Sequence, residues 1–238
     1  MSRQPLLLRI AHGLALVLLL AAPLLTPAMA RMATMALFMA GGFHLRLADR
    51  RFTLRGASSW ISHIRMAPRH VLPWAMAALA ALAGGQGTRA GSILLAATMA
   101  ELLLYSICTH AMARLSRPRI ALVLILLIAS CAIISLETAL YALAFVTGVA
   151  ACLFWLRGPD GEASALSATL AALALTGIAL ALAPALLPRL APLCVVGVLL
   201  ALAHLSTLRR RPVPWRRPDG GDSLVFRRPP WRLAQRLS

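Results

Sequence analysis

The chain has 238 residues, of which 60% are hydrophobic and 13% charged, and its formal net charge is +17. This composition excludes an ordinary soluble globular protein, which is less apolar, and a disordered chain, which is more charged. In a soluble protein the charge would suggest nucleic-acid binding. Here the arginines flank apolar segments, as the positive-inside rule describes for membrane proteins.

Long apolar runs predict an all-α fold, a polytopic transmembrane helix bundle. A bilayer core about 30 Å thick requires roughly 20 apolar residues per helix. Runs such as 14–22 lack the alternation of a barrel strand, so helices must satisfy the backbone in lipid. We expect about eight spans, near residues 10–26, 28–45, 71–87, 92–112, 119–134, 136–156, 164–186 and 191–207.

The distribution of arginine predicts the orientation of these spans. With the N-terminus in the cytoplasm, 21 of the 24 arginines fall on the cytoplasmic side, and Arg31, Arg89 and Arg189 remain outside. Both termini are then cytoplasmic (N-in/C-in). The predicted location is the cell inner (cytoplasmic) membrane, as a multi-pass protein.

The first span competes with a signal peptide. An apolar stretch over 13–22 follows two arginines, and Ala28-Met29-Ala30 matches a cleavage site, so cleavage would leave seven spans. Pro23 and Pro27 also suit a turn between two spans. We therefore favour an uncleaved first helix.

Residues 1–208 are predicted to form the transmembrane bundle, including a cytoplasmic segment at 46–70. This segment is too polar to span, yet Phe52, Trp60 and Ile64 alternate with its arginines. The pattern predicts an amphipathic helix that lies in the membrane interface.

Residues 119–156 are too long for one span and contain neither Gly nor Pro before Gly148. We predict a tight turn at Ser135, which would cap the next helix, with Glu137 in that helix's first turn. Farther along, Gly177 and Gly197 predict close packing in the last two spans.

Glu101 is the acidic residue expected near the centre of a span. An acidic side chain there costs about 2.5–3.5 kcal/mol on insertion scales. Thr98, Glu101, Tyr105 and Cys108 follow a helical spacing that predicts one polar intramembrane stripe. Three roles stay open for Glu101: a hydrogen-bonded structural link between helices, a proton-coupling or substrate-binding group, and a contact to another subunit.

Glu137 and Tyr141 repeat the Glu/Tyr spacing, but Glu137 is expected at the outer end of its span. Stabilising a helix N-terminus is a sufficient reason for an acid there, so pairing with Glu101 is not expected.

The sequence predicts no metal site and no cofactor. Some histidines share a depth that a b-type haem would require, but interfacial histidines that extend toward lipid headgroups explain them better. A methionine stripe on the second span suggests packing more than copper(I) transfer. The cysteines are isolated in apolar runs. These side chains are His12, His110 and His204, Met29, Met32, Met35 and Met39, and Cys108, Cys131, Cys152 and Cys194.

Residues 209–238 form a basic tail rich in proline and are predicted to be a disordered cytoplasmic segment. Its arginine and tryptophan residues predict binding to anionic phospholipid headgroups of the bilayer, ahead of a protein partner and well ahead of nucleic acid. The residues expected at the membrane surface are Arg210, Arg211, Trp215, Arg227, Arg228 and Trp231.

No catalytic motif is present: the chain lacks G-x-S-x-G, H-E-x-x-H and a phosphate-binding glycine loop with lysine. The leading hypothesis is a non-enzymatic permease-like component or a subunit of a membrane complex. The alternative is a membrane-embedded enzyme that acts on a lipid or lipid-linked glycan at the cytoplasmic interface.

Overall fold

The computed structural model describes residues 13, 27–49, 74–158 and 163–208, which are all-helical and contain no strand. The first predicted span, most of the 46–70 segment and the basic tail lie outside these residues. The predicted amphipathic helix and membrane-binding tail therefore stay predictions.

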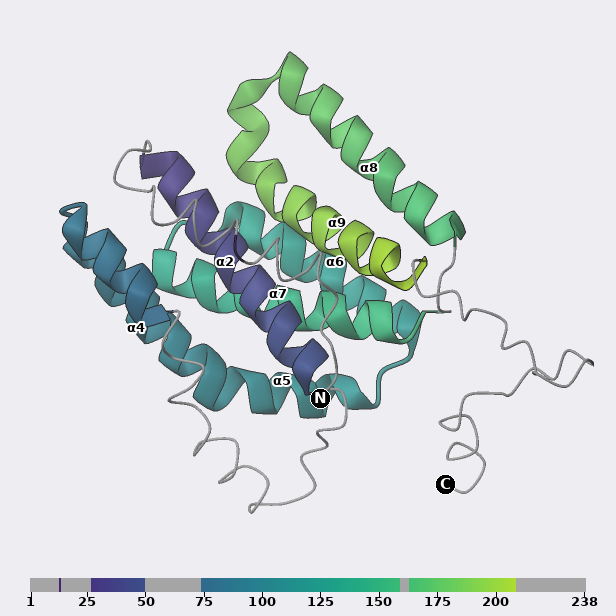
Figure 1. Cartoon of the computed structure of the whole chain (residues 1–238), viewed down its shortest axis with the longest axis horizontal. Coiled ribbons are helices and arrows are strands. Elements are labelled where there is room, and N and C mark those ends of the chain that lie inside the picture. The colour runs from purple at the N-terminus through teal and green to yellow at the C-terminus, as the bar shows by residue number, and fades with distance from the viewer. Residues whose placement is uncertain (1–12, 14–26, 50–73, 159–162, 209–238) are drawn as a thin grey trace, which may run out of the picture. The chain divides into compact units, whose positions relative to one another are not determined.

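From Trp74 to Leu156, and again from Ala163 to Leu208, the helices follow one another with short links (Figure 1). α4, the π-helical turn η2 and α5 are continuous and form one long helix. In chain order the elements are α2 (Pro27–Ala48), a helix over Trp74–Ala83, α4 (Gly87–Met99), η2 (Ala100–Leu104), α5 (Tyr105–Ala113), α6 (Arg117–Ile133), α7 (Glu137–Leu156), α8 (Ala163–Leu182), the 3₁₀ turn η3 (Pro184–Leu186) and α9 (Leu187–Leu208).

Three of these helices are long and apolar enough to cross a membrane. They are Gly87–Ala113, Glu137–Leu156 and Leu187–Leu205, with 27, 20 and 19 residues. Trp74–Ala83 and Leu166–Leu182 are apolar but shorter. The described chain thus has three candidate spans, and a bundle of about eight spans stays a prediction.

The predicted turn between α6 and α7 is confirmed, but its predicted cap is wrong. α6 ends at Ile133, and Glu137 lies in the first turn of α7. The N-cap residue is Leu136, and no side chain makes a capping hydrogen bond. Arg31 instead closes this turn, because its Nη2 donates to the carbonyl oxygens of Ile134 and Ser135 at 2.8 and 3.0 Å.

The most extensive helix contact joins α2 to α7, and two glycines allow it. A Cβ atom on Gly42 would lie 2.1 Å from the carbonyl oxygen of Phe145. A Cβ atom on Gly148 would lie 2.0 Å from that of Met39. Each glycine thus faces the backbone of the other helix, the kind of close approach that small residues allow between membrane helices.

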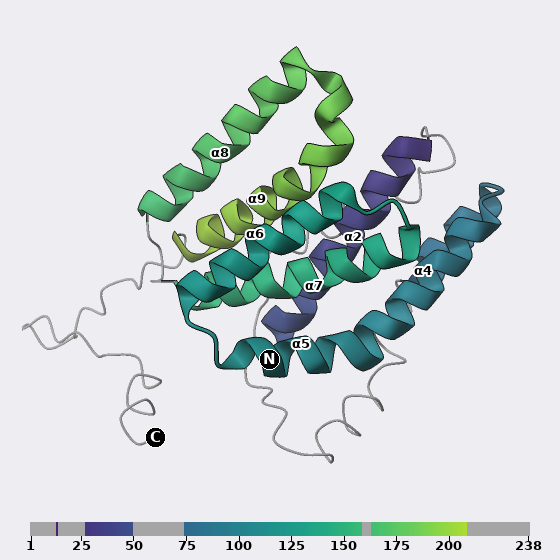
Figure 2. The same ribbon diagram turned by 180° about the vertical axis from the view of Figure 1, so that it is seen from behind.

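Helix α7 lies between several neighbours, which explains why most of its residues are buried. α2, α4, α6 and α9 all contact α7, whereas α8 packs mainly on α9 (Figure 2). The close packing predicted for Gly177 is wrong, since no neighbouring atom lies within 4 Å of a Cβ there. Gly197 does lie against a neighbour, the side chain of Leu173 on α8.

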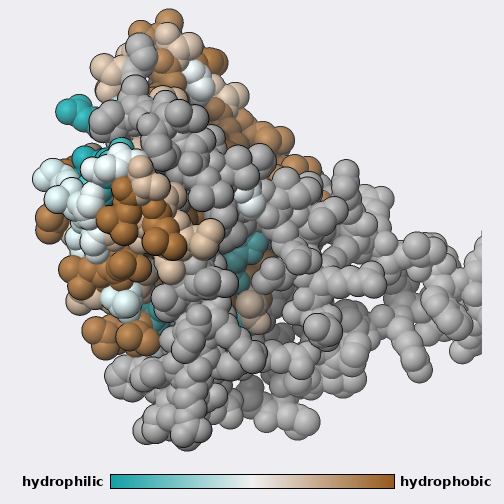
Figure 3. Space-filling model, turned by 60° about the vertical axis from the view of Figure 1, so that its left-hand side comes forward, coloured by the Kyte–Doolittle hydropathy of each residue, from teal (hydrophilic) through white to brown (hydrophobic). Residues whose placement is uncertain are grey.

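Large apolar side chains remain exposed on the described surface. Figure 3 shows such apolar patches on one face, and Leu182 on α8 is 82% exposed. Contiguous apolar surface of this kind is rare on soluble monomers and suits contact with lipid or with another protein. Exposed members on α6 and α8 include Leu122, Ile125, Leu126, Leu170, Leu175 and Ile178.

Candidate functional site

Glu101 is buried in the protein interior, with only 3% of its surface exposed. The indole Nε1 of Trp74 donates a hydrogen bond of 2.7 Å to its Oε1. An indole in an apolar helix needs an acceptor, so each residue satisfies a requirement of the other. Trp74 was not among the predicted site residues, although the need of its indole N–H for an acceptor could have been recognised from the sequence.

The packing around Trp74 fixes the direction of its N–H group. Phe38 of α2 stacks on the indole with ring centroids 4.2 Å apart, and the same Phe38 stacks on Tyr141 of α7 at 5.4 Å. A Cβ atom on Gly41 would lie only 2.8 Å from the indole ring. The absence of a side chain at Gly41 therefore makes room for Trp74.

Glu101 lies in the π-helical turn η2, which interrupts the long helix Gly87–Ala113. The backbone N–H of Tyr105 donates to the carbonyl of Ala100, five residues earlier. Glu101 and Tyr105, four positions apart, are both buried. Single π-helical turns of this kind frequently occur at functional sites.

The predicted polar stripe is only partly formed. Glu101 and Tyr105 are buried, and Cys108 is partly buried against the core. Thr98 is exposed, and its hydroxyl donates to the carbonyls of Leu94 and Leu95. Thr98 therefore does not share the buried environment of Glu101 and Tyr105.

Tyr105 connects this long helix to the C-terminal end of α2. Its hydroxyl donates to Oδ2 of Asp49 at 3.0 Å. Arg46 donates from Nη1 to the backbone oxygen of Asp49 at 3.1 Å. Asp49 was also not among the predicted site residues, because a residue beyond a predicted span gives no sign of its partner.

Arg157 closes the same end of the bundle. Its Nη2 donates to the carbonyl oxygens of Met112 and Ala113 at 3.1 and 2.6 Å, at the C-terminus of α5. Burial, followed by the nearby positive charge of Arg46, lowers the pKa of Arg157. The bond to the negative end of a helix dipole stabilises the cation there.

The other end of the bundle, here called the turn end, contains Arg31, Arg89, residues 134–136 and Arg189. Arg89 pairs with Glu137 at 3.4 Å, and the two side chains are 11% and 29% exposed. Arg89 also donates to the Oε1 atom of Gln86. Glu137 therefore has a partner besides its helix N-terminus, and nothing pairs it with Glu101 among the hydrogen bonds described.

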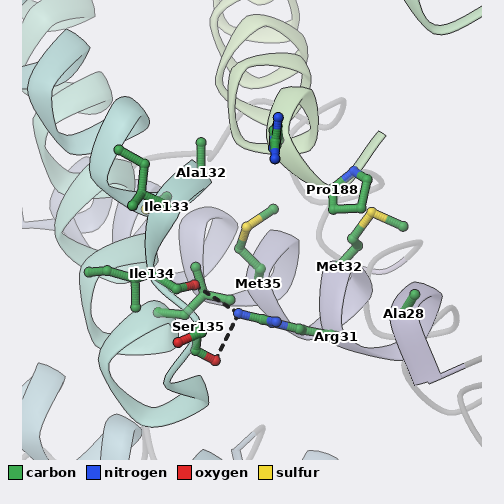
Figure 4. A pocket seen from close by; sticks show the side chains of 12 residues that line it. Ala28, Arg31, Met32, Met35, Ala132, Ile133, Ile134, Ser135 and Pro188 are labelled. Carbon is green, nitrogen blue, oxygen red and sulfur yellow. Dashed lines mark hydrogen bonds between the residues drawn. The ribbon is translucent and has the colours of Figure 1, made fainter. Parts of the chain in front are cut away.

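A cavity of about 300 Å³ opens at the turn end between α2, the link from α6 to α7, and the start of α9. Figure 4 shows Arg31 reaching from α2 to the two turn carbonyls at one side of this cavity. Arg189 of α9 also lines it. The remaining lining includes Met32, Met35, Cys131, Ile133, Ile134 and Leu140.

Within the described residues, no group of three or more His, Cys, Asp or Glu could hold a metal ion. His110 is exposed, whereas His204 is buried on α9. Met35 and Met39 are buried core residues. Cys131 and Cys152 are buried and form no disulfide.

The tail residues expected at the membrane surface lie outside the described residues, as does His12. Comparison with family models, with curated proteins and with solved structures finds no match to this chain.

Proposed function

We propose that this chain is a permease-like component of the inner membrane, multi-pass and N-in/C-in, in which Glu101 binds and releases a proton or holds a cationic substrate group. The observation that carries the proposal is the buried carboxylate of Glu101 in a π-helical turn, hydrogen-bonded by Trp74 at 2.7 Å. Ionisable groups inside membrane segments are rare and mark ion or substrate pathways.

The hydrogen bond itself favours a group that changes its protonation state. An indole N–H donates to a carboxylate oxygen and to the carbonyl oxygen of a protonated carboxyl group alike. Trp74 therefore holds Glu101 in place in both states. A glutamine would make the same bond without the expense of burying an ionisable side chain, so a purely structural role does not require an acid.

The test is a proton-flux assay on the full chain. Purified protein is reconstituted into liposomes that contain a pH-sensitive dye, and a panel of amino acids, sugars, organic cations and organic anions is added outside. We expect substrate-dependent proton flux in the wild type and none with Glu101→Gln. Glu137→Gln is the matched control, because it also removes one acid but lies at the turn end.

Two results would overturn the proposal. One is a wild-type protein without proton flux for every member of the panel. The other is an undiminished flux with Glu101→Gln. Infrared difference spectra between high and low pH add a direct readout, because the carboxyl band assigned to Glu101 should disappear in the Gln variant and persist in Glu137→Gln.

The second candidate is an enzyme that acts on a lipid or lipid-linked glycan at the cytoplasmic interface. Its support is the contact between Tyr105 and Asp49 beside Arg46, an acid and a phenol gathered with a cation at one end of the bundle. General acid and base groups occur in such clusters. Loss of labelled lipid in vesicles, abolished by Asp49→Asn but not by Glu101→Gln, would select this function.

We propose anionic phospholipid headgroups as the partners of the basic tail. The support is the density of arginine and tryptophan in residues 209–238, where each arginine near an anionic surface contributes on the order of 1 kcal/mol. Full-length protein with Arg210, Arg211, Arg227 and Arg228 changed to Gln should co-purify with less phosphatidylglycerol than the wild type. Equal lipid content would refute this partner, and recovery of a stable second protein would favour the alternative of a complex subunit.

A further inference from the structure

The cavity at the turn end combines positive charge with apolar walls. We propose that it binds an anionic amphiphile, a molecule in which a carboxylate or phosphate group is joined to a single apolar chain. Its volume of about 300 Å³ lies at the lower limit for small-molecule pockets, which run from about 300 to 1,000 Å³. The site is separate from Glu101 and does not depend on the function proposed for that residue.

Charge at this cavity selects an anion. Arg31 and Arg189 line it, and none of the described residues in its lining is acidic. The nearby acid Glu137 pairs with Arg89. Helices α2 and α9 also begin at this end, at Pro27 and Leu187, so the positive ends of their dipoles add to the charge of the arginines.

Arg31 keeps donor capacity for a ligand. Both of its bonds to the turn carbonyls are made by Nη2. A guanidinium group has five N–H donors in a planar fork, and that fork matches carboxylate and phosphate oxygens. The turn carbonyls hold Arg31 in one orientation, so little side-chain freedom is lost when an anion binds.

The walls select an apolar chain and not a metal. Met32 and Met35 of α2 lie opposite Ile133 and Ile134 (Figure 4). Methionine side chains adapt to irregular apolar ligands. Thioether and thiol sulfur atoms can also bind copper(I), but two guanidinium groups at the same cavity oppose a cation.

The test uses full-length protein in a neutral detergent and three twelve-carbon probes: dodecyl phosphate, dodecanoate and the neutral dodecanol. Binding is measured by native mass spectrometry and by the shift in thermal unfolding temperature. We expect saturable binding of at least one anionic probe and none of dodecanol. Binding of both anions indicates recognition of charge alone, whereas binding of dodecyl phosphate only assigns a phosphate headgroup.

Arg189→Gln is the decisive variant, because Arg189 is exposed and its replacement should leave the fold intact. We expect the Kd for the anionic probe to rise about tenfold, the change expected when a charged hydrogen bond is lost. Arg119→Gln is the matched control: it removes the same charge from an exposed position at the start of α6 and should leave the Kd within twofold. Arg31→Lys, which keeps the charge but loses the planar fork, should also weaken binding.

The proposal is overturned if the wild type binds neither anionic probe, if dodecanol binds as tightly as the anions, or if Arg189→Gln and Arg119→Gln change the Kd equally. The last result would show that net charge, and not the cavity, attracts the probe. Unfolding temperatures measured without probe separate loss of binding from loss of fold.

Discussion

Replacing Gly148 by alanine should force α2 and α7 apart. The new methyl carbon would lie 2.0 Å from the carbonyl oxygen of Met39, about 1.3 Å closer than the ~3.3 Å at which carbon and carbonyl oxygen normally meet. The obstructing atom belongs to the backbone, so no side-chain rotation relieves the contact. Overpacking of this kind costs typically about 1–3 kcal/mol, and the upper part of that range applies here.

Alanine also favours a helix over glycine by about 1 kcal/mol, which opposes the overpacking. We therefore expect Gly148→Ala to lower the free energy of unfolding by about 2 kcal/mol. Gly177→Ala is the matched control, because nothing lies within 4 Å of the added carbon on α8. It makes the same chemical change and should raise the free energy of unfolding by up to about 1 kcal/mol.

Unfolding is followed by circular dichroism while the purified proteins are titrated with sodium dodecyl sulfate from a neutral detergent. Gly42→Ala should resemble Gly148→Ala, since its methyl would meet the carbonyl oxygen of Phe145 at the same crossing. The double variant should lose less than the sum of the two, because helices already separated by one methyl accommodate the second. Equal midpoints for Gly148→Ala and Gly177→Ala would refute the close backbone contact between α2 and α7.

Three further predictions concern the two ends of the bundle. Arg89 and Glu137 are changed to Gln, singly and together, in a double-mutant cycle of unfolding. We expect a coupling energy of up to about 1 kcal/mol, as for partly exposed ion pairs. Strictly additive effects of the two changes would show that this ion pair does not stabilise the fold. Arg157→Lys should lower the free energy of unfolding by about 1–3 kcal/mol, because the shorter side chain and more strongly hydrated ammonium group are poorer donors to the carbonyls of Met112 and Ala113. Arg119→Lys, at an exposed position, should change the free energy of unfolding little. Green fluorescent protein fused after residue 238 should fluoresce and alkaline phosphatase fused there should be inactive, because the arginine distribution predicts a cytoplasmic C-terminus. The reverse pattern would overturn the predicted orientation.

Helix positions could be predicted from the sequence because they depend on local properties. The length of an apolar run and the residues that punctuate it set where each helix begins and ends. The break between α6 and α7 at Ser135 could be predicted from the length of the apolar run, although neither Gly nor Pro marks it. The residue that closes this turn could not be predicted, because Arg31 is more than one hundred residues away in the sequence.

Contacts between helices could not be predicted in the same way. Apolar residues surround each helix on all sides, so hydrophobic periodicity does not identify the buried face. Small residues on the last two spans predict a packing surface, but only Gly197 packs against the neighbouring helix, whereas Gly177 is exposed. Gly42 and Gly148, which meet the backbone of α7 and of α2, were not predicted. The hydrogen-bond partner of Glu101 could not be predicted either, because Trp74 lies on a separate helix.

The polar stripe predicted from helical spacing includes a π-helical turn. An α-helix advances 3.6 residues per turn, and the turn at 100–104 contains an additional residue. Side chains before and after it therefore do not keep the relation that spacing alone predicts. Glu101 and Tyr105, at and after the wide turn, are buried, whereas Thr98 before it is exposed.

Three arginines do not follow the positive-inside rule in the predicted orientation, and these are the informative ones. The rule gives a sufficient reason for an arginine on the cytoplasmic side, so an individual position there indicates little. In the predicted orientation Arg31, Arg89 and Arg189 lack that reason, and the structure gathers all three at the turn end. Arg31 holds the link between α6 and α7, and Arg89 pairs with Glu137. Arg189 is exposed beside the cavity, so a ligand anion would provide the local reason that the other two already have.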